Sequence, residues 1–336
     1  MDLRTQLNGE IREKGGLDYT GLLGEGFVPI PISVELKEAV EKAELIIIVV
    51  PGPGHEYYAR ALAPILKDGQ MVFLSPGHMG GGLHFQRVLK EMAPSLRVKV
   101  AEVNTLPYGC RLVGPAKVGV YVNRKPVLFS AFPGRHTEEM KAFITRLYPA
   151  FVTARNVLEC GLNYLNALMH IPGMLMNTGW IEFSKGDFNF YSQGITPAVA
   201  RTIEALDKER VQCLLKLGLP PVTFLERFFR QGYTTPQGLA SGSVYRAFQE
   251  SEANRARRAP SDLNHRYLME DGPYGILPMA EVCHLAGVPP PVMDALITLA
   301  SVAAGIDFRK EGLTLDKMGL GGVKAEEIDS FLFEGY

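Results

Sequence analysis

The sequence predicts an α/β protein in two domains, an open parallel sheet with crossover helices followed by an all-helical domain. Over the first 150 residues, short β-branched runs alternate with helical stretches, as in a parallel sheet. After residue 153, long amphipathic segments dominate and period-2 alternation ends. The 336 residues also exceed the size at which single cores stop growing, about 250–300 residues. We therefore divide the chain into domains 1–153 and 154–336.

The elements of the first domain follow from apolar runs bounded by turn residues. The run LIIIVV is uncharged and β-branched, as expected for a strand buried on both faces. Such sheets bind ligands where their strands end, so the loops after the strands are candidate sites. We expect strands at 45–50, 71–77, 97–104, 117–122 and 126–132, with helices at 55–66 and 83–93.

The second domain is expected to consist of amphipathic helices, the longest at 157–183, 196–217 and 291–304. Segment 250–264 is polar and contains a proline, which indicates a solvated connection. A basic patch that binds a partner is the alternative for this segment.

Composition and charge exclude several classes of protein. A net charge of -1 argues against a broad nucleic-acid surface and a polybasic membrane patch. The longest uncharged apolar run, 295–306, is shorter than the about 20 residues that a membrane helix needs. The four cysteines lie far apart, without the spacing of a metal site or a disulfide framework. We expect a cytoplasmic protein with reduced thiols and small-molecule ligands, whose oligomeric state, a homodimer included, stays open.

Two glycine-rich stretches follow predicted strands, PGPGH at 51–55 and PGHMGGG at 76–82. Each is either a tight structural turn or a loop that faces a cofactor. A dinucleotide-binding sheet normally opens with a strand, a GxGxxG turn and a helix, because the pyrophosphate needs close backbone approach. No such fingerprint precedes the first clear strand here.

His170 lies in an apolar stretch, LNALMHIPGMLMNTG. Asn163, Asn166 and His170 are spaced i, i+3 and i+7, which places them on one face of a helix. Pro172 cannot donate to the carbonyl of Leu168, so we expect the helix to kink or open beside His170. The ring is then either a core histidine bound to these asparagines and the freed carbonyl, or a functional group.

Arg266 and Asp271 would point about 140° apart on one continuous α-helix. Gly272 and Pro273 are expected to end that helix and let Asp271 turn back. Arg266 then offers a planar fork to a carboxylate, and Asp271 can orient an imidazole. A structural salt bridge between the two residues is the alternative.

Glu102 and Asn104 fall at the end of a predicted strand, where ligands of α/β sheets bind. Glu102 is suited to accept a hydrogen bond from a substrate ammonium group. The alternative is a strand-end carboxylate on the surface.

Several stretches together resemble the octopine/nopaline (opine) dehydrogenase family, in matching order and over nearly the whole chain. The resemblance implies a Rossmann-type domain joined to an all-helical domain, with substrate between them. It also implies reductive condensation of an α-keto acid with the amine of an amino acid, using NAD or NADP. The stretches are EVNTLPYGCR, NALMHIPGMLMNTGWIE, FYSQGITPAVARTIEALDKER and HRYLMEDGPYGILP.

The same resemblance implies roles for single residues. His170 would be the general acid and base, oriented by Asp271 and supported by Asn166 one turn away. Arg266 would bind the keto-acid carboxylate. The remaining candidates are Glu102 and Asn104 for the amino substrate, Pro51, Gly52, Pro76 and Gly77 for the nicotinamide, and Asp2 for the adenosine ribose.

Two departures from the family stand out. Members open with a strand, a glycine-rich turn and a helix, roughly 30 residues without a counterpart here, so we expect the first βα unit to be missing and cofactor binding to suffer. Asp2 would then end the second strand, and Arg4 nearby would instead favour a 2′-phosphate. Gly272 stands where the family more often has a branched residue, and we expect it to loosen the turn that presents Asp271.

Two other functions stay open at this point. One is a two-domain hydroxy-acid or keto-acid reductase similar to ketopantoate reductase, without amine condensation. The other is a non-catalytic binding protein that keeps the helical domain. The sequence identifies neither the keto acid nor the amino acid, and it does not separate NAD from NADP.

Overall fold

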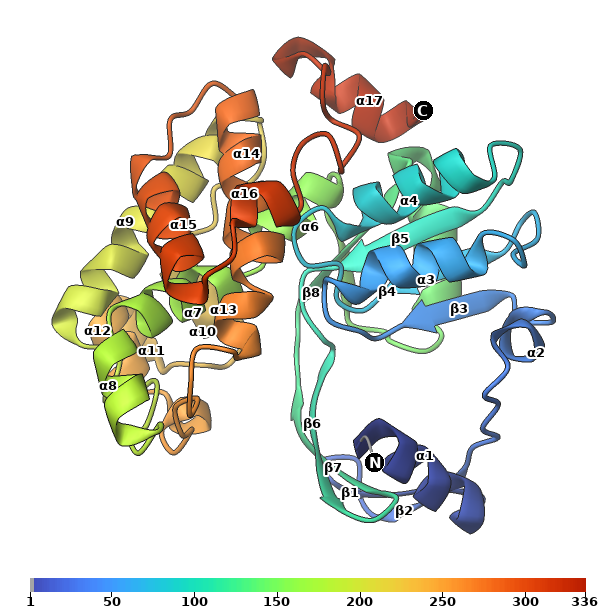
Figure 1. Cartoon of the computed structure of the whole chain (residues 1–336), viewed down its shortest axis with the longest axis horizontal. Coiled ribbons are helices and arrows are strands. Elements are labelled where there is room, and N and C mark those ends of the chain that lie inside the picture. The colour runs from blue at the N-terminus through green and yellow to red at the C-terminus, as the bar shows by residue number, and fades with distance from the viewer. Residues whose placement is uncertain (1–2) are drawn as a thin grey trace.

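The strands of the first half form two sheets. The computed structural model describes residues 3–336, and Figure 1 shows both sheets on one side of the molecule and most helices of the second half on the other. The main sheet contains, in spatial order, β3 (Leu45–Ile48), β4 (Met71–Leu74), β5 (Lys99–Val103), β8 (Val127–Phe132) and β9 (Phe151–Thr153). β3, β4 and β5 are parallel as predicted, but β8 runs antiparallel to β5.

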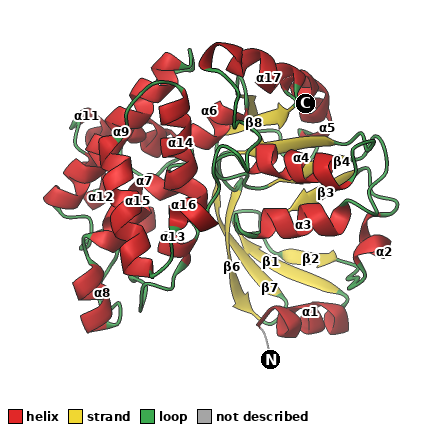
Figure 2. Ribbon diagram, turned by 45° about the horizontal axis from the view of Figure 1, so that its top comes forward, coloured by secondary structure: helices red, strands yellow, loops and turns green. Residues whose placement is uncertain are grey.

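Helices cover both faces of the main sheet, which explains its uniformly apolar strands. Val72 and Leu74 point to the face that packs against α3 (Gly54–Leu62) and α4 (Gly81–Met92). The intervening Phe73 points to the other face, beside α5 (Thr137–Ile144). Figure 2 shows α3 and α4 lying across the strands. The predicted strand-helix alternation is therefore confirmed for these elements.

A second sheet was not predicted. It contains, in spatial order, β2 (Gly26–Pro29), β1 (Gly16–Gly21), β7 (Lys117–Asn123) and β6 (Tyr108–Gly114). The strand expected at 117–122 exists, but as β7 it pairs with β1 and β6 because a tight turn folds it back onto β6. Two helices flank β1 and β2 in the chain, α1 (Leu3–Lys14) and α2 (Leu36–Val40).

The helical domain is built around one large apolar core. The helix expected at 157–183 is three helices, because the side chain of Asn163 donates to the carbonyl of Glu159 at 2.8 Å and closes the first one. Residues 250–264 connect two helices, as predicted. The helices are α6 (Val157–Leu162), α7 (Asn166–Leu175), α8 (Thr178–Ser184), α9 (Pro197–Lys216), α10 (Phe224–Arg230), α11 (Pro236–Ala240), α12 (Val244–Gln249), α13 (Arg266–Met269), α14 (Leu277–Leu285) and α15 (Pro291–Ala304).

The end of the chain returns to the first domain. After α16 (Phe308–Glu311), the last helix α17 (Ile328–Glu334) lies beside the main sheet (Figure 1). The rings of Phe331 and Tyr336 pack against Phe132 at centroid distances of 5.5 and 5.6 Å. The stretch expected to belong wholly to the helical domain therefore also contributes to the sheet domain. Within residues 3–336, no helix has the length and apolarity needed to cross a membrane.

Candidate active site

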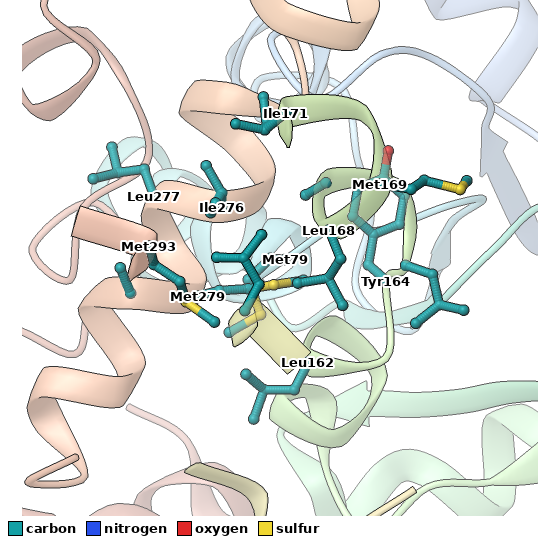
Figure 3. Close-up of a cluster of buried hydrophobic side chains, with 14 of the residues drawn as sticks. Met79, Leu162, Tyr164, Leu168, Met169, Ile171, Ile276, Leu277, Met279 and Met293 are labelled. Carbon is teal, nitrogen blue, oxygen red and sulfur yellow. The ribbon is translucent and has the colours of Figure 1, made fainter. Parts of the chain in front are cut away.

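His170 lies on α7, which the core of the helical domain holds in place. Leu168 is fully buried, and Figure 3 shows it beside Met79 and Met279. His170 itself is 4% exposed. The helix continues through Pro172, so it does not open beside His170, and a kink at this point stays a prediction. The imidazole therefore sits on a buried and well-supported element.

The two ring nitrogens of His170 lie within hydrogen-bond distance of a carboxylate and of a phenol hydroxyl. Nδ1 lies 2.6 Å from Oδ2 of Asp271, and Nε2 lies 2.7 Å from the hydroxyl of Tyr191. The expected asparagine partners bind elsewhere, since Asn163 closes α6 and Asn166 donates to a tyrosine hydroxyl at 3.3 Å. The interpretation of His170 as a core histidine bound to these asparagines is wrong.

A widened helical turn aims Asp271 at the imidazole. The chain passes from α13 into a π-helical turn, Gly272–Ile276. The amide of Asp271 donates to the carbonyl of Arg266 at 3.2 Å, and the amide of Ile276 donates to the carbonyl of Asp271 at 2.8 Å. This five-residue spacing carries Arg266 and Asp271 toward the same face, as an α-helix would not. The α-helix ends at Met269, slightly before the predicted end at Gly272, but the chain then continues as a π turn through Pro273, whose missing N–H is tolerated in the first turn.

Gly272 packs this turn tightly. A Cβ at this position would lie 2.3 Å from Cε2 of Phe308, whose ring is fully buried. The absent side chain thus leaves room for an aromatic ring. The expected loosening of the turn is not found.

Three tyrosines complete the site, and sequence analysis missed all of them. Tyr164 donates to Oδ1 of Asp271 at 2.6 Å. The ring of Tyr267 stacks on His170 with centroids 3.6 Å apart and planes 16° apart, and the hydroxyl of Tyr191 lies 3.3 Å from that of Tyr267. Tyr267 directly follows Arg266 in the chain, but tyrosine is too common for this adjacency to have been a signal.

The electrostatics suit proton transfer at Nε2 of His170. Burial lowers the pKa of His170, and the neighbouring Asp271 opposes that effect by its charge and its hydrogen bond. Nδ1–H donates to the carboxylate, which leaves Nε2 of the neutral ring as an acceptor. Burial raises the pKa of Tyr191 well above its ordinary value of 10, so this residue stays a neutral phenol. The proton that His170 can transfer is therefore the one at Nε2.

Arg266 pairs with Glu270 and not with Asp271. Its Nε lies 3.2 Å from Oε2 of Glu270, and its side chain is 55% exposed. The alternative of an Arg266–Asp271 salt bridge is therefore wrong. Burial raises the pKa of Glu270 to about 7, against the opposing charge of Arg266. Glu270 thus holds one edge of the Arg266 guanidinium, and the rest of the group is accessible to an anion.

The loops after β3 and β4 meet the helical domain at Glu270. The amide of Gly52 donates to Oε1 of Glu270 at 3.4 Å, and Nε2 of His78 lies 3.1 Å from the same oxygen. Burial lowers the pKa of His78 well below its ordinary value, so this is a contact of a neutral imidazole. The ring of His78 also packs edge-on against Tyr164, with centroids 5.0 Å apart. These loops carry the four candidate nicotinamide residues, Pro51, Gly52, Pro76 and Gly77.

Glu102 and Asn104 are buried and bind backbone groups. Glu102 accepts from the amide of Gly82 at 2.6 Å, and its Oε1 has no hydrogen-bond partner within the described residues. Burial raises the pKa of Glu102 to about 8. Asn104 donates to the carbonyl of Asn163 at 3.2 Å and accepts from the amide of Leu128 at 2.9 Å. A surface strand-end carboxylate is therefore the wrong description of Glu102, and contact of either residue with an amino substrate stays a prediction.

The ends of the parallel strands fit one half of a dinucleotide site. β3 and β4 direct their carboxyl ends and glycine-bearing loops toward the helical domain, where open sheets bind ligands. Among the described residues no strand pairs with the outer edge of β3, which borders an open apolar pocket of about 490 Å³. Asp2, the residue expected at the adenosine ribose, lies outside the described residues. Contact of Pro51, Gly52, Pro76 and Gly77 with the nicotinamide of NAD or NADP stays a prediction.

Comparison with known proteins agrees with this arrangement. Residues 153–304 match the family model described as NAD/NADP octopine/nopaline dehydrogenase, alpha-helical domain. Opine dehydrogenase of Arthrobacter sp. (strain 1C) is 33% identical over 332 residues, which cover 98% of this chain and 90% of that relative. A structure of octopine dehydrogenase with NADH and L-arginine has a TM-score of 0.76 at 20% identity and covers 98% of this chain and 90% of that one. A ketopantoate reductase from Ralstonia eutropha JMP134 is more distant, with a TM-score of 0.57 at 15% identity, covering 89% of this chain and 88% of that one.

The match to a relative over nearly the whole chain, together with the family model and the fold, defines a two-domain oxidoreductase that uses NAD or NADP. The sequence match over nearly the whole chain is more specific, and this chain belongs to the opine dehydrogenase family. The predicted combination of a Rossmann-type sheet and an all-helical domain is confirmed. The ketopantoate reductase alternative survives only as a distant structural likeness.

Proposed function

We propose that this enzyme condenses an α-keto acid with the amino group of an amino acid and reduces the adduct to a secondary amine with NADH or NADPH. The observation that carries the proposal is the buried pair of His170 and Asp271 one helical turn from the half-exposed Arg266. Related structures support the substrate class. Octopine dehydrogenase has been solved with L-arginine, pyruvate or agmatine, and yersinopine dehydrogenase with NADP⁺.

Each proposed step uses a group already in place. The guanidinium of Arg266 binds the keto-acid carboxylate. The amine attacks the carbonyl carbon, and the proton held at His170 goes to the carbonyl oxygen. This oxygen takes a second proton from the amine nitrogen and leaves as water, which gives an iminium ion. A reduced nicotinamide held at the loops after β3 and β4 would supply the hydride that converts the iminium ion to the neutral secondary amine. Asp271 keeps the imidazole in one tautomer and stabilises its protonated form, and positioned proton transfer of this kind contributes about 10²–10⁴ in rate.

The two domains divide these tasks in our proposal. Residues 1–153 hold the nicotinamide at the loops after β3 and β4. Residues 154–336 hold the proton-transfer pair and the carboxylate clamp. Glu270 joins the halves, because it contacts Gly52 and His78 on one side and lies next to Asp271 on the other.

The decisive experiment measures whether cofactor oxidation needs an amine. NADH and NADPH are tested with pyruvate alone and with pyruvate plus a panel of amino acids that includes L-arginine, and products are identified by mass spectrometry. We expect an amine to accelerate oxidation and a secondary-amine dicarboxylate to accumulate. Oxidation that depends on pyruvate but not on any amine would identify a simple keto-acid reductase. His170→Ala should lower turnover at least about 10²-fold, and thermal unfolding would establish that the variant folds.

A further inference from the structure

No ring nitrogen of His170 faces open space. Asp271 occupies Nδ1 and the hydroxyl of Tyr191 occupies Nε2. Tyr267 covers one face of the ring, and Phe190 lies edge-on to it at 6.2 Å between centroids. A substrate atom cannot contact Nε2 while the hydroxyl of Tyr191 is there. The proton of Nε2 therefore either passes through this hydroxyl or reaches the substrate only after Tyr191 has moved away.

Packing holds Tyr191 in place. Its ring stacks on Phe248 with centroids 5.7 Å apart and planes 6° apart, and Phe190 packs edge-on against it at 5.0 Å. Tyr191 is 3% exposed, and both phenylalanines are fully buried or nearly so. Moving the phenol away from Nε2 would break these contacts in a close-packed interior. Passage of the proton through the hydroxyl needs no such movement.

The hydroxyl groups form a directed chain toward the surface. In the protonated state, Nε2–H of His170 donates to Tyr191 across 2.7 Å, and Tyr191 donates to the hydroxyl of Tyr267 across 3.3 Å. The hydroxyl proton of Tyr267 is then free to donate outward. Tyr267 is only partly buried, and it interacts electrostatically with Arg266, its neighbour in sequence. The chain thus ends beside the residue that we propose to bind the keto acid.

We propose that Tyr191 and Tyr267 relay the proton between His170 and the substrate carbonyl oxygen. The relay rests on the proposed function, and it deepens that function by naming the groups that carry the proton. In the reductive direction, Tyr267 gives its hydroxyl proton to the carbonyl oxygen, Tyr191 replaces it, and Nε2 of His170 replaces that of Tyr191. Both phenols end neutral, the imidazole ends neutral, and no electrons move along the chain.

The test removes single hydroxyl groups and keeps the rings. Tyr191→Phe and Tyr267→Phe are compared with wild type and with Tyr245→Phe, a matched control on α12, in the NADH, pyruvate and amino-acid assay. We expect each relay variant to lower kcat about 10²-fold, with a much smaller change in the keto-acid KM, and the control to keep its kcat. We also expect the solvent deuterium isotope effect on kcat to rise in the relay variants, because proton delivery becomes rate-limiting. Thermal unfolding establishes that the variants fold.

Three outcomes would overturn the relay. A Tyr191→Phe variant with unchanged or higher kcat and a lower KM would show that Tyr191 only occupies Nε2 until substrate displaces it. A His170→Ala/Tyr191→Phe double variant that falls by the product of the single effects would show that the two residues act independently. His170→Ala alone separates this inference from the proposed function. If that variant is inactive while Tyr191→Phe and Tyr267→Phe are active, the relay fails and the assignment of His170 stands.

Discussion

Replacing Asp271 by asparagine tests the centre of the site with almost no change in volume. The amide oxygen can still accept from Tyr164, so we expect the π turn to persist. Either orientation of the amide removes the negative charge now 2.6 Å from Nδ1 of His170. A hydrogen bond to a charged group is worth about 1.5–3 kcal/mol, which corresponds to a loss of about 10- to 150-fold in kcat if the pair acts mainly in the transition state.

The same variant should also change how kcat depends on pH. Asp271 raises the pKa of His170 against the effect of burial, so the variant should have a lower His170 pKa. The protonated ring is the acid in the reductive reaction, and activity falls as pH rises through its pKa. We therefore expect the alkaline limb of the kcat profile to move to lower pH.

A surface pair supplies the matched control. Asp294 lies 2.9 Å from Nε2 of His284, and the side chain of His284 is 47% exposed. Asp294→Asn removes the same kind of contact far from the proposed chemistry and should leave kcat and its pH profile unchanged. The measurement is initial-rate kinetics from pH 5 to 10. An Asp271→Asn enzyme within about threefold of wild type, with an unmoved alkaline limb, would refute the assigned role of Asp271.

Three further predictions concern binding and stability. Arg266→Lys loses the planar fork and should raise the keto-acid KM about 10-fold or more with a smaller change in kcat, and an unchanged KM in the same assay would contradict the clamp role. Burial raises the pKa of Glu102 from 4.5 to about 8, so the folded protein holds a proton that the unfolded chain releases, and the free energy of unfolding should fall between about pH 5 and 8. Glu102→Gln should flatten this slope in urea titrations, whereas equal slopes for both proteins would exclude Glu102 as its source. Gly272→Ala places a methyl 2.3 Å from Phe308 and should lower the free energy of unfolding by about 1–3 kcal/mol, and urea curves that coincide with wild type would show that the ring yields freely.

Sequence patterns brought together the proposed catalytic pair but predicted its surroundings incorrectly. His170 and Asp271 were paired by residue chemistry and by the family resemblance, and the structure places them in contact. The i, i+3, i+7 reasoning assumed one continuous helix, which Asn163 interrupts. Asp271 was expected to turn back because the helix ends at Gly272, whereas a π turn brings it toward the imidazole. Both differences have one cause, because sequence periodicity and breaker residues do not specify the helix geometry that local hydrogen bonds decide.

The sequence by itself determined the two domains, most main-sheet strands and their helices, and the residue types suited to carboxylate binding and proton transfer. These features depend on local periodicity and composition, which neighbouring residues carry. Only the tertiary structure decided that Arg266 pairs with Glu270, that β7 belongs to a second sheet, and that Tyr191 occupies Nε2 of His170. These pairings depend on the packing of segments far apart in the sequence and on turns a few residues long. Several residues of the same chemical type could form each contact, and only the folded geometry decides which one does.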